Sequence, residues 1–248
     1  MLDLRAHRNL MAVCSSIGGE RGGDGGELFF AADSDLPFMN IAARAEPGDD
    51  AGGFVERAQD FFAERGRGFC VFAWPGDPAV ERAALAAGGF EVMARYPELV
   101  CRAPVPQPAG DVRSVETEEQ GAAYWRICDV AYPSLGMPAD FFTPTFAAGE
   151  MLPRDDREAC LGYLDGEPVA CASVFLAEGL GMICWVGTLP EARGRGLAAA
   201  VTAWATNRAF ALGADAAVLQ ASVMGEPIYL RMGYEELYAY RLLGFTPD

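Results

Sequence analysis

The chain has 248 residues, of which 51% are hydrophobic and 22% are charged, a composition typical of a folded globular protein. Its formal net charge of −16 leaves no basic surface of the kind that binds a phosphate backbone, so we expect no nucleic-acid partner. The sequence contains no lysine, which excludes a lysine Schiff base and a Walker-type phosphate loop.

Cysteine and histidine usage argues against disulfide and metal chemistry. The seven cysteines are scattered, are never spaced as Cys-x-x-Cys and often lie in apolar runs, so we interpret them as buried thiols of a reducing compartment. His7 is the sole histidine, which argues against a His-based metal site or a Ser–His pair, and no metal is expected. No window approaches about 18 consecutive apolar residues, so we expect a cytoplasmic protein without a membrane partner.

The first 104 residues mix short helical and extended patterns. Apolar residues at helical spacing predict a helix over 51–66, with Phe54, Ala58 and Phe62 on one face. In chain order, we expect a helix at 3–14, strands at 27–33 and 38–44, the helix at 51–66, a strand at 69–74, a helix at 78–87 and a strand at 91–102.

A proline-rich stretch, residues 103–110, separates this part from the rest of the chain. It has three prolines in eight residues and no periodicity, which is typical of a linker. We therefore expect a lobe at 1–104, a linker at 105–110 and a domain at 111–248.

The second part has a richer pattern. Its strands and helices do not alternate strictly, which predicts an α+β fold with a mostly antiparallel sheet flanked by helices. The expected elements are a strand at 111–115, helices at 118–130 and 139–148, strands at 157–164, 167–177 and 180–188, a helix at 196–212, a strand at 216–221, a helix at 226–232 and a strand at 234–243.

A short internal echo links the two parts. In each, an apolar strand, a short helix, a glycine–aromatic pair and another strand follow in the same order, with Gly89-Phe90 aligned on Gly233-Tyr234. The echo indicates two copies of one fold, and a common βαβ-like unit is the alternative.

Residues 191–198, Glu-Ala-Arg-Gly-Arg-Gly-Leu-Ala, lead into the Ala-rich helix. A helix N-terminus exposes unpaired N–H groups and a partial positive charge, and glycine permits positive φ there. Arg193 and Arg195 would add charged donors at the same place. The turn therefore predicts an anion site, most simply for a pyrophosphate, and a flexible surface corner is the alternative.

A dinucleotide fingerprint explains this turn poorly. Gly194-x-Gly196-x-x-Ala199 fits its letters, and Asp215 follows at about the right distance. However, Asp215 stands before its strand, whereas the acid that binds the ribose belongs at the end of a strand. The preceding strand also ends several residues before the turn, with Pro190 in between.

A third pattern fits. The stretch "TLPEARGRGLA" resembles the acyl-CoA loop of the GNAT superfamily of N-acetyltransferases, in which Arg or Gln-x-x-Gly-x-Gly/Ala opens a helix after a strand and a proline. Arg193, Gly196 and Ala198 take those places. Downstream, "GEPIYLRMGYEE" resembles the second signature of the family, with Tyr229 at the catalytic tyrosine. The resemblance covers about 111–248.

The resemblance implies an N-acetyltransferase that moves an acetyl group from acetyl-CoA to a primary amine, of a small molecule or a peptide, by direct attack. Backbone amides near Thr188 would stabilise the oxyanion, and Tyr229 would protonate the departing thiolate. A non-catalytic acyl-CoA-binding regulatory module is the alternative. The residues implied to bind acetyl-CoA are Val186, Thr188, Arg193, Gly194, Arg195, Gly196, Leu197 and Ala198.

Two departures from the family pattern stand out. Where the family often has a Glu on the strand before the glycine loop, this chain has Met182 and Cys184, so Glu178 at the turn into that strand becomes the candidate base. An exposed turn residue is the alternative interpretation of Glu178. The N-terminal lobe resembles a degenerate copy, as in a tandem GNAT protein, with Leu85 in the place of Tyr229, and we expect it to bind no acyl-CoA.

Overall fold

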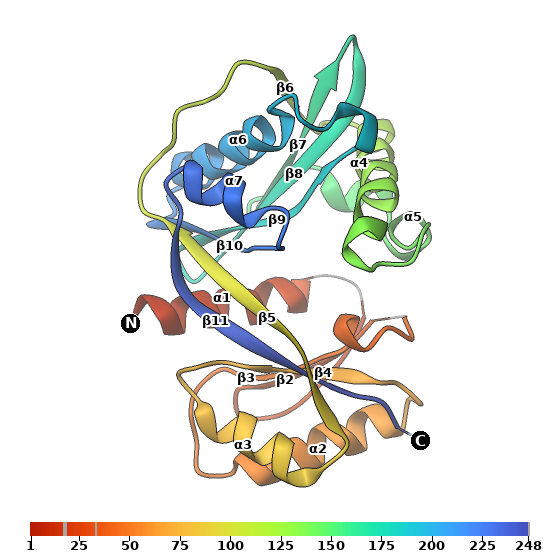
Figure 1. Ribbon diagram of the computed structural model, residues 1–248, viewed down its shortest axis with the longest axis vertical. Coiled ribbons are helices and arrows are strands. Elements are labelled where there is room, and N and C mark those ends of the chain that lie inside the picture. The colour runs from red at the N-terminus through yellow and green to blue at the C-terminus, as the bar shows by residue number, and fades with distance from the viewer. Residues whose placement is uncertain (17–18, 33, 248) are drawn as a thin grey trace. The chain divides into compact units, whose positions relative to one another are not determined.

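A computed structural model of the protein describes residues 1–16, 19–32 and 34–247. The chain forms two compact units, Met1–Glu98 with Glu236–Asp248, and Leu99–Glu235. Both are α+β, and their strands are mostly antiparallel, as predicted (Figure 1). In this division the last strand of the chain belongs to the first unit, and residues 99–110 belong to the second.

The first unit orders its strands β1-β2-β3-β4-β11-β5. Strands β1, β2 and β3 pair antiparallel, β3 and β4 pair parallel across helix α2, and β11 pairs antiparallel with β4. Its elements are α1 (Leu2–Ser16), β1 (Glu20–Gly22), β2 (Glu27–Ala31), the 3-10 helix η1 (Pro37–Met39), β3 (Ile41–Arg44), α2 (Ala51–Ala63), β4 (Phe69–Ala73), α3 (Pro78–Ala87), β5 (Phe90–Cys101) and β11 (Glu235–Phe245).

The second unit orders its strands β10-β9-β8-β7-β6. All neighbours are antiparallel except β9 and β10, which are parallel and joined by helix α6. Its elements are β6 (Asp111–Ser114), α4 (Glu118–Ala131), η2 (Tyr132–Leu135), α5 (Phe142–Thr145), η3 (Ala148–Met151), β7 (Arg157–Leu164), β8 (Glu167–Ala177), β9 (Leu180–Thr188), η4 (Pro190–Ala192), α6 (Leu197–Ala211), β10 (Ala216–Gln220) and α7 (Glu226–Arg231).

Helices α4 and α6 cover opposite faces of the sheet of the second unit (Figure 1). The Cys160 thiol donates to the Val201 carbonyl of α6 (3.7 Å), whereas Ser173 bonds to the Tyr124 hydroxyl of α4 (3.0 Å). Cys160 pairs with Ala172, the neighbour of Ser173, so the alternation of side chains along a strand separates the two contacts. The Ala-rich sequence of α6 lets this helix approach the sheet closely, with eight of its residues buried.

Part of the order of elements recurs in both units, and it includes the strand, short helix and strand of the internal echo. In each, antiparallel strands lead to a parallel pair joined by a helix, β3-α2-β4 or β9-α6-β10. A short helix, α3 or α7, and a further strand follow. The turns before α2 and α6 therefore occupy corresponding places.

The stretch predicted as a linker is fixed along α6. Asn207 bonds to both backbone groups of Val105, at 2.8 and 2.9 Å, and Gln107 donates to the Ala200 carbonyl at 3.0 Å. These bonds anchor the proline-rich stretch within the second unit.

The helix predicted at 139–148 is wrong. The chain forms one turn of α5 and a separate η3 instead. Asp129 accepts hydrogen bonds from the amides of Phe142 (2.5 Å) and Thr143 (3.1 Å), which fixes the start of α5. Phe146 then adopts an extended conformation, and its ring stacks on Trp125 at 4.8 Å. Packing of an aromatic side chain ends the helix that the local pattern would continue.

Smaller differences lie in the first unit. The helix predicted at 51–66 ends at Ala63, and the strand predicted at 38–44 begins as the 3-10 turn η1, so that only Ile41–Arg44 is extended. The last residue of the strand predicted at 27–33 lies outside the described residues.

The cysteines agree with their prediction as buried thiols. All seven are free, and six are buried. Burial raises the pKa of Cys14 and of Cys70 to about 12, so both are protonated at neutral pH. Within the described part of the chain, no helix has the length and apolar character needed to span a membrane.

Candidate functional site

The turn between β9 and α6 holds two glycines in the left-handed conformation. Gly194 has φ 74°, and Gly196, the N-cap of α6, has φ 79°. A Cβ atom at either position would meet nothing within 4 Å, so it is the positive φ that favours glycine here, and not a lack of space. Both glycines are exposed, and the turn presents its backbone to the outside.

The amides of this turn have no internal acceptor. For residues 194–199, no intramolecular hydrogen bond from a backbone N–H is found among the described residues, and the ladder of α6 starts with Ala200 N–H donating to the Gly196 carbonyl at 3.0 Å. No side chain caps α6, and its first turn contains no acidic residue. The partial positive charge of the helix N-terminus is therefore available to an anion.

The two arginine side chains of the turn lie in different surroundings. Arg193 Nε donates to the Thr188 carbonyl at 3.2 Å. Its Nη2 donates to the Ala131 carbonyl at 3.4 Å and to Ser134 Oγ at 3.3 Å. Arg193 thus ties the turn to the end of α4. Arg195 is exposed and does not line the adjacent pocket.

Strand β9 carries a bulge beside this turn. The register between β8 and β9 shifts between Cys171 and Ser173, so that Trp185 and Val186 together oppose Ala172. Trp185 has φ 46°, a conformation that bulky residues rarely adopt. Such strain often marks a functional site.

The bulge turns the Val186 amide away from α4. The Trp185 carbonyl accepts hydrogen bonds from the Tyr124 hydroxyl (3.2 Å) and the Cys171 thiol (3.5 Å). In a trans peptide the C=O and the N–H point in opposite directions, so the Val186 N–H points away from both donors. In the described chain, β10 pairs with β9 only over residues 180–182, so the bulge lies beyond that ladder.

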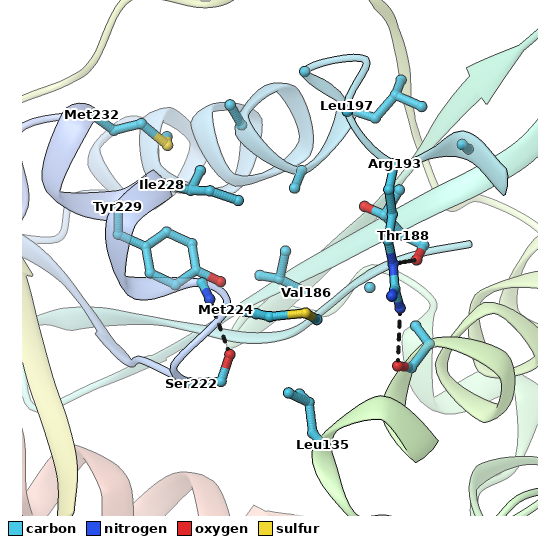
Figure 2. Close-up of a pocket in the computed structure, with 18 of the residues that line it drawn as sticks. Leu135, Val186, Thr188, Arg193, Leu197, Ser222, Met224, Ile228, Tyr229 and Met232 are labelled. Carbon is cyan, nitrogen blue, oxygen red and sulfur yellow. Dashed lines mark hydrogen bonds between the residues drawn. The ribbon is translucent and has the colours of Figure 1, made fainter. Parts of the chain in front are cut away.

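A pocket of about 610 Å³ lies between the turn, the bulge and α7 (Figure 2). It brings together most of the predicted binding residues, and Arg195 is the exception among them. The predicted residues that line it are Val186, Thr188, Arg193, Gly194, Gly196, Leu197, Ala198 and Tyr229.

Tyr229 projects from α7 into this pocket, with its hydroxyl directed to the side of Val186 and Met224 (Figure 2). Its ring lies on Gly225, where an added Cβ atom would come within 2.7 Å of the ring. The Tyr234 ring packs at 6.1 Å from it. Only 8% of Tyr229 is exposed, so the phenol is held in one place.

Comparison with known proteins identifies the domain that contains this pocket. Residues 122–234 match the sequence profile of the Acetyltransferase (GNAT) family. The chain contains a GNAT acetyltransferase domain. A search of curated protein sequences found no match.

Solved structures share the fold over nearly the full length of the chain. A GCN5-related N-acetyltransferase from Kribbella flavida is 28% identical, covers 99% of this chain and 96% of its own, and superposes with a TM-score of 0.78. A tandem GNAT protein from the clavulanic acid biosynthesis pathway shares the fold, with 14% identity, coverage of 100% and 94%, and a TM-score of 0.61. A GCN5-related N-acetyltransferase from Sphaerobacter thermophilus, 14% identical, shares it with a TM-score of 0.62 over 90% and 77% of the chains.

Glu178 lies at the other end of β9 from the GNAT pocket. It occupies the two-residue turn between β8 and β9, where it has φ 54° and Gly179 has φ 70°, the left-handed pair typical of a type I′ hairpin. Eight residues of extended chain, roughly 26 Å at 3.3 Å each, separate it from Val186. The geometry does not bring Glu178 to the pocket, and it is an exposed turn residue.

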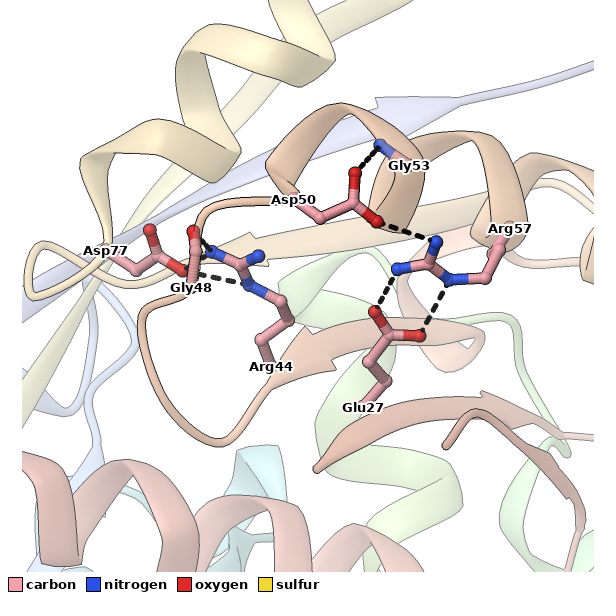
Figure 3. Close-up of polar contacts among 7 residues, drawn as sticks. All are labelled: Glu27, Arg44, Gly48, Asp50, Gly53, Arg57 and Asp77. Carbon is pink, nitrogen blue, oxygen red and sulfur yellow. Dashed lines mark hydrogen bonds and ion pairs between the residues drawn. The ribbon is translucent and has the colours of Figure 1, made fainter. Parts of the chain in front are cut away.

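The corresponding turn of the first unit is the one before α2, and there a carboxylate of the chain itself caps the helix (Figure 3). Asp50 caps α2 by accepting a hydrogen bond from the Gly53 amide at 3.0 Å. Arg57 bonds to Asp50 at 2.9 Å and to both carboxylate oxygens of Glu27, at 2.5 and 3.1 Å. Hydrogen bonding from Arg57, aided by the Gly53 amide, lowers the pKa of Asp50.

A buried ion pair holds the start of the same loop (Figure 3). Arg44, at the end of β3, pairs with Asp77, and both are at least nine-tenths buried. Arg44 also donates to the Gly48 carbonyl at 3.1 Å and lies over the Phe54 ring at 5.7 Å. The loop between β3 and α2 is therefore fixed at both ends by its own side chains.

Several pocket residues were not predicted from the sequence. Ile228 and Met232 line the wall beside Tyr229, and their spacing along the chain was a usable signal. Leu135 reaches the pocket from η2, far away in sequence, and no local pattern marks it (Figure 2).

Proposed function

We propose that this chain transfers the acetyl group of acetyl-CoA to a primary amine, of a small molecule or a peptide, by direct attack of the amine on the thioester carbonyl. One observation carries the proposal: five residues whose amides have no acceptor in the described chain, Gly194 and residues 196–199, line a pocket into which Tyr229 projects. Acyl transfer from acetyl-CoA is the activity of the GNAT family to which the domain belongs.

The amides of residues 194–199 would bind the diphosphate of the cosubstrate. Their number and the left-handed glycines suit an extended anion better than a single oxygen. Arg193 holds the turn in shape through Thr188 and Ala131, so its part is indirect. The fit of the chain to acetyl-CoA thus rests on backbone groups.

The Val186 amide would stabilise the oxyanion that forms when the amine attacks. It borders the pocket, and the bulge turns it away from α4. A donor that is already oriented needs no reorganisation as the negative charge develops on the carbonyl oxygen, and such donors contribute about 10²–10³ in rate.

Tyr229 would act as the general acid. As the tetrahedral intermediate collapses, the C–S bond breaks, and the hydroxyl of Tyr229 gives its proton to the leaving thiolate. The phenolate then regains a proton from solvent, to which the attacking nitrogen loses one proton as it becomes the neutral amide. Its fixed position in the pocket supports this part.

Deprotonation of the amine is not assigned to Glu178, because the turn between β8 and β9 lies far from the pocket. An amine that is neutral when it binds, or one that loses its proton through water, needs no carboxylate at this point.

Thiol release tests the proposal. We expect the protein to release free CoA from acetyl-CoA when a suitable member of an amine panel is added. Tyr229→Phe should lower kcat at least about 100-fold and leave the calorimetric affinity for CoA unchanged. Binding of CoA without thiol release for any amine would instead favour a non-catalytic acyl-CoA-binding module, and unchanged turnover in Tyr229→Phe would remove the acid role.

A further inference from the structure

Three hydrogen-bond donors, two on α4 and one on β8, contact the Trp185 carbonyl at the β9 bulge. The Tyr124 hydroxyl lies 3.2 Å from it, the Cys171 thiol 3.5 Å and the Cys128 thiol 4.0 Å. Tyr124, Cys128 and Cys171 are all fully buried. Both sulfurs are weak donors, so the hydroxyl is the strongest of the three.

The Tyr124 hydroxyl has few hydrogen-bond acceptors within reach. Its hydroxyl is also 3.0 Å from Ser173 Oγ, and Ser173 itself donates to the Cys184 carbonyl at 3.0 Å. Because the Ser173 proton is used in that bond, the Tyr124 hydroxyl donates in a shared arrangement to Ser173 Oγ (3.0 Å) and the Trp185 carbonyl (3.2 Å), with the Cys184 carbonyl farther away at 3.4 Å. Burial raises the pKa of Tyr124, so the hydroxyl keeps its proton across the neutral range.

The side chain of Trp185 is fixed as well. Its ring packs edge-on against Trp125 at 5.2 Å and lies 5.6 Å from Phe146. With the ring and the carbonyl both held, the left-handed backbone of Trp185 has a structural cause, since a bulky residue would otherwise leave that conformation.

We propose that Tyr124 is a positioning residue for the acyl-transfer reaction: its hydroxyl holds the Trp185 peptide so that the Val186 amide faces the thioester carbonyl. The inference rests on the proposed function for its catalytic consequence. Tyr124 touches neither substrate, and it acts through one peptide plane, whose C=O it binds and whose N–H it thereby directs.

Tyr124→Phe tests this role, because it removes the hydroxyl and keeps the ring. We expect kcat to fall about tenfold, less than the loss of a whole oxyanion donor, with KM for acetyl-CoA and the affinity for CoA changed less than about twofold. Tyr234→Phe is the matched control. It removes a buried hydroxyl that bonds to Thr206 of α6 at 2.6 Å, and it should match the thermal destabilisation with kcat unchanged.

Amide hydrogen exchange tests whether Tyr124 holds the Trp185 peptide, and this measurement does not depend on enzymatic turnover. We expect residues 184–187 to exchange at least about tenfold faster in Tyr124→Phe than in the wild-type protein or in Tyr234→Phe. Cys128→Ala, which removes the weakest donor, should move exchange and kcat in the same direction by about twofold or less, and it remains informative if Tyr124→Phe does not fold.

The two failures are distinguishable. If the wild-type protein is inactive but amide exchange at residues 184–187 still depends on Tyr124, the proposed function is overturned. The structural role of Tyr124 in holding the Trp185 peptide would then still stand. Equal effects of Tyr124→Phe and Tyr234→Phe on both kcat and exchange would overturn the positioning role.

Discussion

The two units meet the same physical requirement at corresponding turns, in opposite ways. At the start of α2, the Asp50 carboxylate accepts from the Gly53 amide, and Arg57 holds that carboxylate in place. At the start of α6, the N-cap is Gly196, the first turn of the helix carries no acidic residue, and the amides of 194–199 have no acceptor in the described chain. One helix N-terminus is satisfied from within, and the other is left for an external anion.

The short helices that follow these turns, α3 in the first unit and α7 in the second, also differ from each other. Tyr229 in α7 lines the pocket and is 8% exposed, whereas Leu85, which takes its place in α3, is 45% exposed. Thus the unit with open amides has a buried phenol in its short helix, whereas the unit with a capped α2 has an exposed leucine at that place. The comparison leads us to propose that a few residues at corresponding places in the two units decide whether a unit can bind an acyl-CoA.

The largest expected effect comes from making the second turn resemble the first. Gly196→Asp places a carboxylate at the N-cap of α6, where it would compete with a diphosphate for the amides. We expect CoA affinity to fall about 100-fold, from repulsion between charges roughly 5 Å apart at an effective dielectric constant of about 20.

Gly196→Asn is the matched control for this variant. Asn tolerates the left-handed φ of 79° and has nearly the same shape without the charge, so CoA affinity should change less than about fivefold. Calorimetry measures both variants. Equal losses in the two would attribute the effect to strain and not to charge.

A smaller effect on CoA affinity distinguishes the contribution of the backbone amides at the α6 turn from that of its arginine side chains. Arg193→Ala removes the bonds to Thr188 and Ala131 and should weaken CoA binding about tenfold through loss of order in the turn. Arg195→Ala removes an exposed charge and should cost less than about threefold. A larger loss for Arg195 than for Arg193 would contradict the backbone account.

Removing the side-chain cap at the turn before α2 should change the stability of the protein but not its binding of CoA. Asp50→Ala removes the cap of α2 and the bond to Arg57, and we expect Tm to fall by about 2–4 °C. Asp50→Asn keeps a capping side chain and should lose less. Neither variant should bind CoA at this turn, because Glu46 and Asp49 remain in the loop. A second equivalent of CoA bound by Asp50→Ala would break the comparison.

The smallest effect concerns pH. The pKa of Asp50 is lowered in the folded protein, so its contribution to the stability of α2 is present above its unfolded value, about pH 4, and is lost as the pH falls through the lowered value. Fraying of the first turn of α2, followed by NMR, should therefore appear on acidification. Asp50→Asn should lack this dependence, and an identical acid profile in the variant would contradict the role of the carboxylate.

The sequence predicted features that depend on local spacing. The glycine turn, Tyr229 and the order of most strands and helices were all predictable, because a left-handed glycine or an apolar stripe leaves its mark within a few residues. The placement of β11 in the first unit was not predictable, since pairing with β4 joins Gly244 to Cys70 across most of the chain.

The finer geometry of the site was also beyond the sequence. At the β9 bulge, Tyr124 of α4 donates to the Trp185 carbonyl, a contact between distant segments that no local pattern marks. The guanidinium of Arg193 looked like a phosphate ligand from its place in the motif, yet it bonds to carbonyls of Thr188 and Ala131. Glu178 was chosen for its closeness in sequence, and an extended strand carries it away from the pocket.

The most direct measurement of the central claim is an NMR titration of the backbone amides with CoA, which reads both turns in one spectrum. The account predicts large downfield shifts for amides within residues 194–199, as they donate to the diphosphate, and unchanged signals for Ala51–Gly53 at the start of α2. Shifts at α2, or CoA binding that leaves the amides of 194–199 unmoved, would contradict it.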